Sequence, residues 1–137
     1  MWTLMKILLV EDSRILRDRL RGIIGAIPQA ILVAETDNED DARVQLNQHR
    51  PDLAVIDLRL RNGSGLSLIA HIKAVHQATT MIVLTNLAHA EYRARCMELG
   101  AHYFFDKSKG IGAFTHLLAD LGKRPTASAA AWRTGAP

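Results

Sequence analysis

The stretch LAVIDLRLRNGSG, residues 53–65 of a chain of 137 residues, gives the clearest indication of the fold. Its first four residues are apolar and do not alternate with polar ones, which is typical of a short strand covered on both faces of a sheet. The run ends on Asp57, and residues 62–65, NGSG, have the composition of a turn that leads into a helix. A carboxylate at the end of such a buried strand needs a chemical reason.

Four further apolar runs have the length of a strand. The first, second and fourth of the five runs are rich in leucine or β-branched residues without clean alternation, so we expect them also to be covered on both faces. In chain order the four are MKILLV (5–10), AILVAE (30–35), TMIVLT (80–85) and HYFFD (102–106).

The segments between these runs have the apolar spacing of helices. In the last of them the residues at i, i+3, i+4 and i+7 are all apolar, from Phe114 to Leu121. Ser13, Asn38 and Ser64 can cap the first three helices, because their side-chain oxygens can accept a backbone N–H of the first turn. Strand and helix thus alternate five times over about residues 5–122. This pattern predicts a doubly wound α/β domain with a parallel sheet and helices on both faces.

Composition limits the class of protein. An apolar fraction of 48% and a charged fraction of 23% are average for a globular domain. No apolar run approaches the roughly 20 residues of a membrane helix, and acidic residues come too early for a signal peptide, so we expect a cytoplasmic protein. Cys96 is the single cysteine, which excludes an internal disulfide and a cysteine-based zinc site.

The formal charge of +3 is unevenly distributed. All 14 acidic residues lie at or before Asp120, whereas three of the 17 basic residues lie after it. The body is therefore neutral, and residues 123–137 form a basic, alanine-rich segment that we expect to be a flexible tail. Trp132 is the one residue of this tail with a side chain suited to anchoring on a surface.

Functional groups of open parallel sheets gather beyond the carboxyl ends of the strands. Glu11, Asp12 and Asp57 follow two of the predicted strands, and three carboxylates at one place repel one another unless a cation neutralises them. A hard divalent ion such as Mg²⁺, with retained waters, is the natural occupant. Any one of these residues alone is more often a helix cap or a surface charge. Their coincidence at strand ends is what points to a site.

A hydroxyl and a lysine complete the predicted site. Thr85 and Lys107 follow or end two further strands, and together with a metal they suit a tetrahedral anion such as a transferring phosphoryl group. A carboxylate is an accepted phosphoryl nucleophile that gives an aspartyl phosphate. Asp57, central among these groups, is the predicted acceptor.

The segments KILLVEDS, LAVIDLRLRNGSGL, MIVLTN and YFFDKS, in this order and spacing, resemble the receiver domain of two-component response regulators from about Lys6 to Leu121. The resemblance implies a flavodoxin-like (βα)5 fold with strand order 2-1-3-4-5. It implies that Asp57 takes a phosphoryl group from a histidine kinase or a histidine phosphotransfer protein. It also implies that Mg²⁺, or Mn²⁺, is held by Asp12, Asp57 and the backbone carbonyl of Arg59, with Glu11 acting through water.

The same resemblance assigns roles to the remaining groups. Lys107 pairs with the phosphoryl oxygens, the Thr85 hydroxyl moves in to bond them, and Phe104 turns inward as Thr85 moves. The output is a population shift in the face formed by the fourth helix, the fifth strand and the fifth helix, which controls a protein partner. Both a monomer and a phosphorylation-dependent homodimer are compatible with the sequence.

Three positions depart from the family pattern. Asn86 stands where a small residue is usual, and we expect it to change the hydrolysis rate of the aspartyl phosphate. Ser108 replaces a common proline, so a cis peptide would cost roughly 3 kcal/mol, and we expect a weaker hold on Lys107. Arg59 adds a cation at the pocket rim, which either tunes access of the phosphodonor or pairs with Glu11.

Other functions remain as alternatives. The chain could be the receiver portion of a transcription factor, but nothing after residue 122 can form a helix-turn-helix, so we expect no direct binding to nucleic acid, and none to membranes. An aspartate-based phosphohydrolase is disfavoured because Arg59 replaces the second acid of its DxD motif, and we expect no enzyme activity beyond self-phosphorylation and dephosphorylation. A degenerate receiver is disfavoured because the predicted acids, threonine and lysine are all present.

Overall fold

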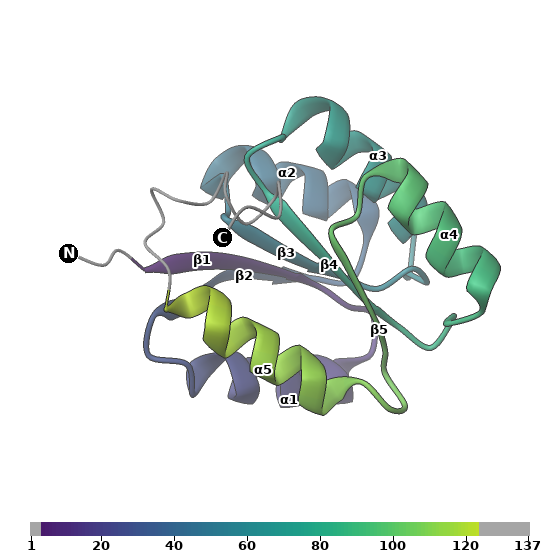
Figure 1. Cartoon of the computed structure of the whole chain (residues 1–137). Helices are drawn as coiled ribbons and strands as arrows, with labels where there is room; N and C mark the ends of the chain where they lie inside the picture. The colour runs from purple at the N-terminus through teal and green to yellow at the C-terminus, as the bar shows by residue number, and fades with distance from the viewer. Residues whose placement is uncertain (1–3, 124–137) are drawn as a thin grey trace.

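The computed structural model describes residues 4–123 and shows a central sheet between two layers of helices (Figure 1). All strands run parallel, in the order β2-β1-β3-β4-β5, which confirms the predicted flavodoxin-like topology. The strands are β1 (Met5–Val10), β2 (Ala30–Thr36), β3 (Leu53–Ile56), β4 (Thr80–Thr85) and β5 (Tyr103–Asp106).

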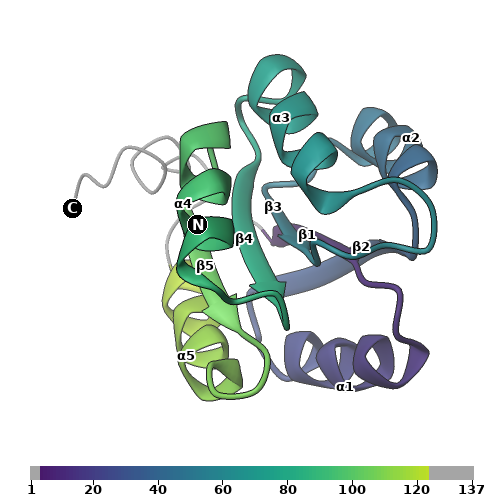
Figure 2. The ribbon, with the colours of Figure 1, turned by 90° about the vertical axis from the view of Figure 1, so that its right-hand side faces the viewer.

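Helices α1 and α5 cover one face of the sheet, and α2, α3 and α4 cover the other (Figure 2). The predicted caps are present: Ser13, Asn38 and Ser64 each accept a hydrogen bond from the backbone N–H three residues later. The helices are α1 (Arg14–Gly25), α2 (Glu39–His49), α3 (Gly65–Val75), α4 (Ala90–Leu99) and α5 (Ile111–Gly122).

Two hydrophobic clusters lie on opposite faces of the sheet. Strand β3 contributes to both, because Leu53 and Val55 pack toward α1 and α5 while Ala54 and Ile56 pack toward the other three helices. Strands β1, β3 and β4 are almost entirely buried, as predicted. The prediction is wrong for β2, which pairs only with β1 and is half-buried, with Ile31 42% exposed.

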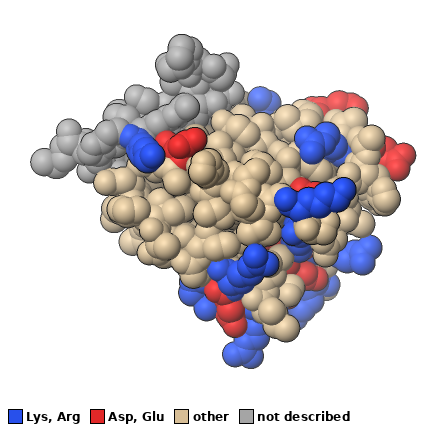
Figure 3. Space-filling model, turned by 60° about the horizontal axis from the view of Figure 1, so that its bottom comes forward, with Lys and Arg blue, Asp and Glu red and all other residues tan. Residues whose placement is uncertain are grey.

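The two helices on one face of the sheet, α1 and α5, differ in the number of charged residues that they carry. Helix α5 carries a single charged residue, Asp120, whereas α1 is rich in arginine. Figure 3, which brings this side forward, shows a broad uncharged area bordered by side chains of both charges. Most of the predicted tail, including Trp132, lies outside the described residues, and within them no helix is long and apolar enough to cross a membrane.

Candidate functional site

Three carboxylates meet at the carboxyl edge of the sheet. Val10 and Ile56 are paired in neighbouring strands, so the residues that follow them emerge side by side. The Asp57 N–H donates to the Val10 carbonyl at 2.9 Å, which extends the ladder by one residue and fixes the Asp57 backbone. Oxygens of Glu11, Asp12 and Asp57 all lie within 4.8 Å of one another, so the structure brings the predicted metal ligands together.

Lys107 bridges two of these acids. Its Nζ lies 2.8 Å from Glu11 Oε1 and 2.8 Å from Asp57 Oδ2, and its side chain is only 10% exposed. Burial acts to lower the pKa of Lys107, but the hydrogen bonds with Asp57 and Glu11 outweigh it and raise the pKa. The Lys107–Ser108 peptide is trans. Two carboxylates bond the ammonium group directly, and the expectation of a weaker hold on Lys107 than in a proline-containing loop stays a prediction.

Glu11 is the most buried member of the cluster. Burial, reinforced by the charge of Asp57, raises its pKa to about 7, against the opposing effects of the Lys107 ammonium and of the Ser13 N–H that donates to Glu11 Oε2 at 3.0 Å. Asp12, by contrast, is exposed. Three carboxylates facing one lysine leave an excess of anionic oxygen, and this donor set fits a hard divalent cation.

A cavity of about 160 Å³ opens beside these groups. Thr85 is fully buried beneath it, and its Oγ1 accepts the Leu87 N–H at 3.1 Å. A larger cavity of about 490 Å³ lies beside His76 and His102, but no carboxylate lines it. Chemistry therefore favours the smaller cavity, which is lined by Asp12, Ser13, Asp57, Arg59, Thr85, Asn86, Leu87 and Lys107.

Two predicted residues behave differently from the rest. Phe104 does not line the cavity; it is buried in the core, with the Arg93 guanidinium 4.7 Å from its ring centre. Arg59 lines the cavity but is exposed, and among the described residues its guanidinium forms no ion pair with Glu11. The pairing alternative for Arg59 is therefore wrong, since Lys107 occupies the Glu11 carboxylate.

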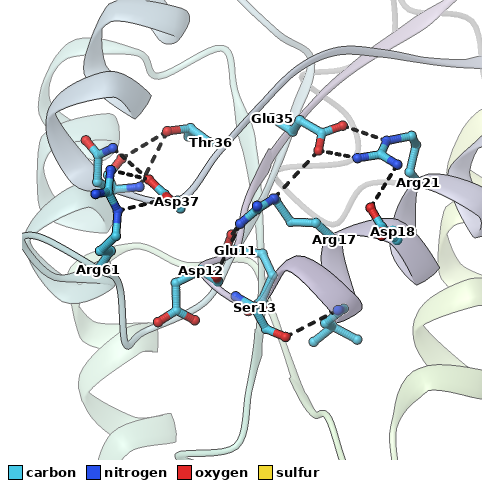
Figure 4. Close-up of polar contacts among 12 residues, drawn as sticks. Glu11, Asp12, Ser13, Arg17, Asp18, Arg21, Glu35, Thr36, Asp37 and Arg61 are labelled. Carbon is cyan, nitrogen blue, oxygen red and sulfur yellow. Dashed lines mark hydrogen bonds and ion pairs between the residues drawn. The ribbon is translucent and has the colours of Figure 1, made fainter.

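Arg17 is a residue of this site that sequence reasoning missed. Its Nη1 donates to the carbonyl of Glu11 at 2.8 Å and to that of Asp12 at 3.2 Å (Figure 4). Its Nε lies 3.7 Å from Glu35 at the end of β2. Arg17 thus ties the backbone of the acidic pair to α1 and β2. The available signal was its position one helical turn after the Ser13 cap, which places it back over the strand end.

This chain is similar in sequence to curated bacterial regulators. The DNA-binding transcriptional activator DevR/DosR of Mycobacterium tuberculosis is 29% identical over 120 residues, which cover 87% of this chain and 55% of that protein. In four other curated relatives, the match to this chain spans between 34% and 51% of the relative's length.

Solved structures share the fold at low identity. The isolated REC domain of RcsB from Salmonella enterica serovar Typhimurium, in the presence of phosphomimetic BeF3⁻, gives a TM-score of 0.81 at 21% identity, over 90% of this chain and 91% of that one. The Mn²⁺-bound form of the response regulator Rcp1 gives a TM-score of 0.71 at 23% identity, over 85% and 90% of the two chains.

The model of the response regulator receiver domain matches residues 7–119, which include every element from β1 to most of α5. The match spans the whole carboxylate cluster, Thr85 and Lys107. The fold, the strand order and this match agree, and the chain belongs to the response regulator receiver domain family of two-component systems.

Proposed function

We propose that Asp57 accepts a phosphoryl group from the histidine of a partner kinase or phosphotransfer protein, and that the modification switches a protein-binding face. The observation that carries the proposal is the bridging position of Lys107, 2.8 Å from both Glu11 and Asp57, beside a cavity that also reaches Thr85. A nucleophilic carboxylate, a cation and a hydroxyl are thereby gathered around one space of suitable size.

In the proposed transfer, an Asp57 carboxylate oxygen forms a bond to phosphorus as the bond from phosphorus to the donor imidazole nitrogen breaks. The donor ring reacts with its other nitrogen protonated, so the electron pair of that bond leaves it as a neutral imidazole on the partner protein. The Lys107 ammonium neutralises charge on the phosphoryl oxygens, and this positioned charge is the main contribution that such a site needs to make.

Asp12, Asp57 and the carbonyl of Arg59 would hold Mg²⁺ or Mn²⁺, with Glu11 acting through water. When bound, the ion supplies positive charge to the phosphoryl oxygens. The residues present fit this role, because the three acids lie within 4.8 Å of one another and offer only oxygen ligands. Arg17 keeps the Glu11 and Asp12 backbone in place for it.

The proposed switch begins at Thr85. Its Oγ1 already accepts the Leu87 N–H, so the hydroxyl proton is available to donate to a phosphoryl oxygen. Movement of Thr85 would open space toward Phe104 in the neighbouring strand, and the face of α4, β5 and α5 would change. The uncharged surface over α5 suits a protein partner, or a second copy of the chain after phosphorylation.

The remaining expectations belong to the same proposal. The protein acts in the cytoplasm as a switch rather than as an enzyme on other substrates. It binds neither nucleic acid nor membrane through residues 5–122, which form the receiver domain. Its tail, from residue 123 onward, has no proposed role.

The test is intact mass after incubation with Mg²⁺ and a small phosphodonor such as acetyl phosphate. We expect a gain of one phosphoryl group in the wild type and none in Asp57→Asn. Asp52→Asn is the matched control, because Asp52 precedes the same strand at its other end and bonds the Lys6 N–H there. Absence of the gain under conditions that label another receiver domain would refute the proposal.

A second candidate is the receiver portion of a transcriptional regulator. The observation that favours it is that curated relatives such as DevR/DosR are transcriptional activators and are about twice as long as the matched region. The coding sequence beyond the codon of Pro137 separates the two: a following DNA-binding domain supports this candidate, and an immediate stop codon removes it.

A further inference from the structure

The carboxylate of Glu39 lies at the start of α2 and reaches the loop that joins β3 to α3. Only 11% of this side chain is exposed, although glutamate is among the residues least often buried. A buried carboxylate needs hydrogen-bond partners to offset its loss of water. The partners of Glu39 therefore show which part of the structure depends on it.

Three groups from two segments surround the Glu39 carboxylate. Oε1 accepts the Ser64 N–H at 3.0 Å, and Oε2 accepts the Ser67 hydroxyl at 2.8 Å. Arg43, one turn further along α2, donates to Oε2 at 2.6 Å. Burial alone raises the pKa of Glu39, but the bonds from Arg43, Ser64 and Ser67 outweigh it and lower the pKa, so the group is a carboxylate at neutral pH.

Backbone bonds hold the same loop against the end of β2. The Glu39 N–H donates to the Asn62 carbonyl at 3.0 Å, and the Arg61 N–H donates to the Asp37 carbonyl at 3.0 Å. The Arg61 guanidinium closes over the Asp37 carboxylate, with Nε 2.9 Å from Oδ2 (Figure 4). Two consecutive loop residues, Arg61 and Asn62, are thus bonded to Asp37 and Glu39.

Gly63 shows how closely the loop approaches Glu39. Its backbone has a φ of +82°, and a Cβ added there would lie 2.5 Å from the Glu39 Cβ and 2.6 Å from Oε1. Side-chain contacts of this length do not occur, so the loop and the glutamate pack without spare space. Glu39 and Gly63 therefore specify the position of the loop jointly.

The clamped segment leads directly to the phosphoacceptor. Ser64, which bonds Glu39, forms an isolated antiparallel bridge with Arg59 across the loop. The Arg59 N–H in turn lies 3.4 Å from Asp57 Oδ1, and the Gly65 N–H donates to the Leu58 carbonyl at 3.0 Å. A displacement of Ser64 is thus transmitted to Arg59, whose carbonyl is the proposed backbone ligand of the metal.

We infer that Glu39 is a positioning residue for the metal and phosphoryl site, acting through Ser64 to fix the Arg59 carbonyl beside Asp57. This inference rests on the proposed phosphoacceptor function of Asp57. Glu39 touches neither the metal nor the phosphoryl group. Its role is to hold a ligand-bearing loop on a rigid pair of elements, the end of β2 and the first turn of α2, so that the site is preformed.

The experiment compares Glu39→Ala, Glu39→Gln and Asp40→Ala by two readouts. One is Mg²⁺ affinity from calorimetry, and the other is amide hydrogen exchange of residues 58–64 without metal. We expect Glu39→Ala to weaken Mg²⁺ binding by about 3- to 10-fold, below the range for direct partners of ligands, and to speed exchange of the loop. Asp40 lies in the same first turn but is exposed, so its variant should match the wild type.

Glu39→Gln separates positioning from charge. Its amide oxygen can accept the Ser64 N–H and its NH₂ can donate to the Ser67 oxygen, but that NH₂ cannot accept the bond from Arg43. We therefore expect affinity and exchange between those of Glu39→Ala and those of the wild type. If Glu39→Ala fails to fold, Ser67→Ala removes one bond of the clamp and should shift both readouts in the same direction. Wild-type Mg²⁺ affinity and loop exchange in Glu39→Ala would overturn the inference. Failure of the wild type itself to bind Mg²⁺ would instead overturn the proposed function.

Discussion

Asn86 stands directly after the proposed switch threonine, exposed and lining the same cavity as Asp57. An amide of this size beside the proposed phosphorylation site would limit the approach of a water molecule or a phosphatase. We predict that Asn86→Ala changes the lifetime of the phosphorylated protein, with faster hydrolysis as the expected direction. The decay of the phosphoryl label by intact mass measures this, and equal lifetimes in the two proteins would remove the role of Asn86.

His76 is a buried histidine whose Nε2 has no hydrogen-bond partner among the described residues. Burial, then the charges of His71 and Arg50, lower its pKa below the usual 6.5. The unfolded chain therefore binds more protons in this range than the folded one. The contribution of neutral His76 to stability is fully present above the unfolded pKa and is lost as the pH falls through it toward the folded pKa.

We predict that His76 lowers the free energy of unfolding of the wild type relative to that of His76→Gln as the pH is lowered from about 7 to about 5.5, by at most about 1.4 kcal/mol per pH unit for each extra proton bound by the unfolded chain. Glu11 acts in the opposite direction over this range, because its pKa is raised to about 7, and the comparison with His76→Gln cancels its effect. Urea titrations at a series of pH values measure the slope for each protein. His76→Gln should shift this slope, whereas a substitution of the exposed His116 should not. An unchanged slope in His76→Gln would contradict the assignment.

Gly65, the first residue of α3, is the glycine among the described residues where an added Cβ would make the shortest contact. A Cβ at Gly65 would lie 2.2 Å from the Asp57 carbonyl oxygen and 2.6 Å from the Leu58 Cα, both of them backbone atoms. We predict that Gly65→Ala displaces the loop that joins β3 to α3, lowers the free energy of unfolding by about 1–3 kcal/mol or more, and abolishes the proposed phosphorylation of Asp57. Chemical denaturation and intact mass measure the two effects.

Gly22 provides the control within the same class of substitution. It lies in α1, is exposed, and has open space where a Cβ would go. Gly22→Ala should therefore raise the free energy of unfolding by about 0.5–1 kcal/mol and leave phosphorylation intact, because alanine loses less backbone entropy in a helix. Equal behaviour of the two variants would show that the close contact at Gly65 does not constrain the loop.

The elements differ in how far sequence alone predicts them. Ser13, Asn38 and Ser64 are found as predicted caps because capping is local, and the strand ends carry their acids wherever the parallel sheet forms. The roles of Arg17 and Glu39 were not predictable in this way. Each depends on which segments distant in sequence lie beside its helix, and on which side-chain rotamer reaches them. The prediction that β2 is buried failed for the same reason, because whether a strand lies at the edge of the sheet depends on which strands pair with it.

The reactivity of the Cys96 thiol can be used to measure the unfolding of the whole molecule. It is fully buried in the cluster beneath α4, and burial raises the pKa of its thiol to about 11. Only the accessible thiolate reacts with disulfide reagents. We predict that labelling at mildly alkaline pH proceeds through opening of the fold, and that its rate rises with denaturant in parallel with global unfolding.

Met97 supplies the matched position for this measurement. It is the next residue of α4 and is 44% exposed. In a Cys96→Ser, Met97→Cys protein the thiol should react at close to the rate of an unfolded chain, with no dependence on low denaturant. Rapid labelling of Cys96 in the wild type would instead show that α4 detaches locally, without unfolding of the sheet.

The sheet divides the interior into two closed compartments, and the aromatic residues of β5 are shared between them. Phe104 belongs to the compartment under α2, α3 and α4, while its neighbours Tyr103 and Phe105 belong to the one over α1 and α5. A rotation of the Phe104 ring therefore acts directly only on the packing under α2, α3 and α4. A change of the α5 part of the proposed switch face would have to pass through β5 itself, because Tyr103 and Phe105 of this strand pack on the α5 side.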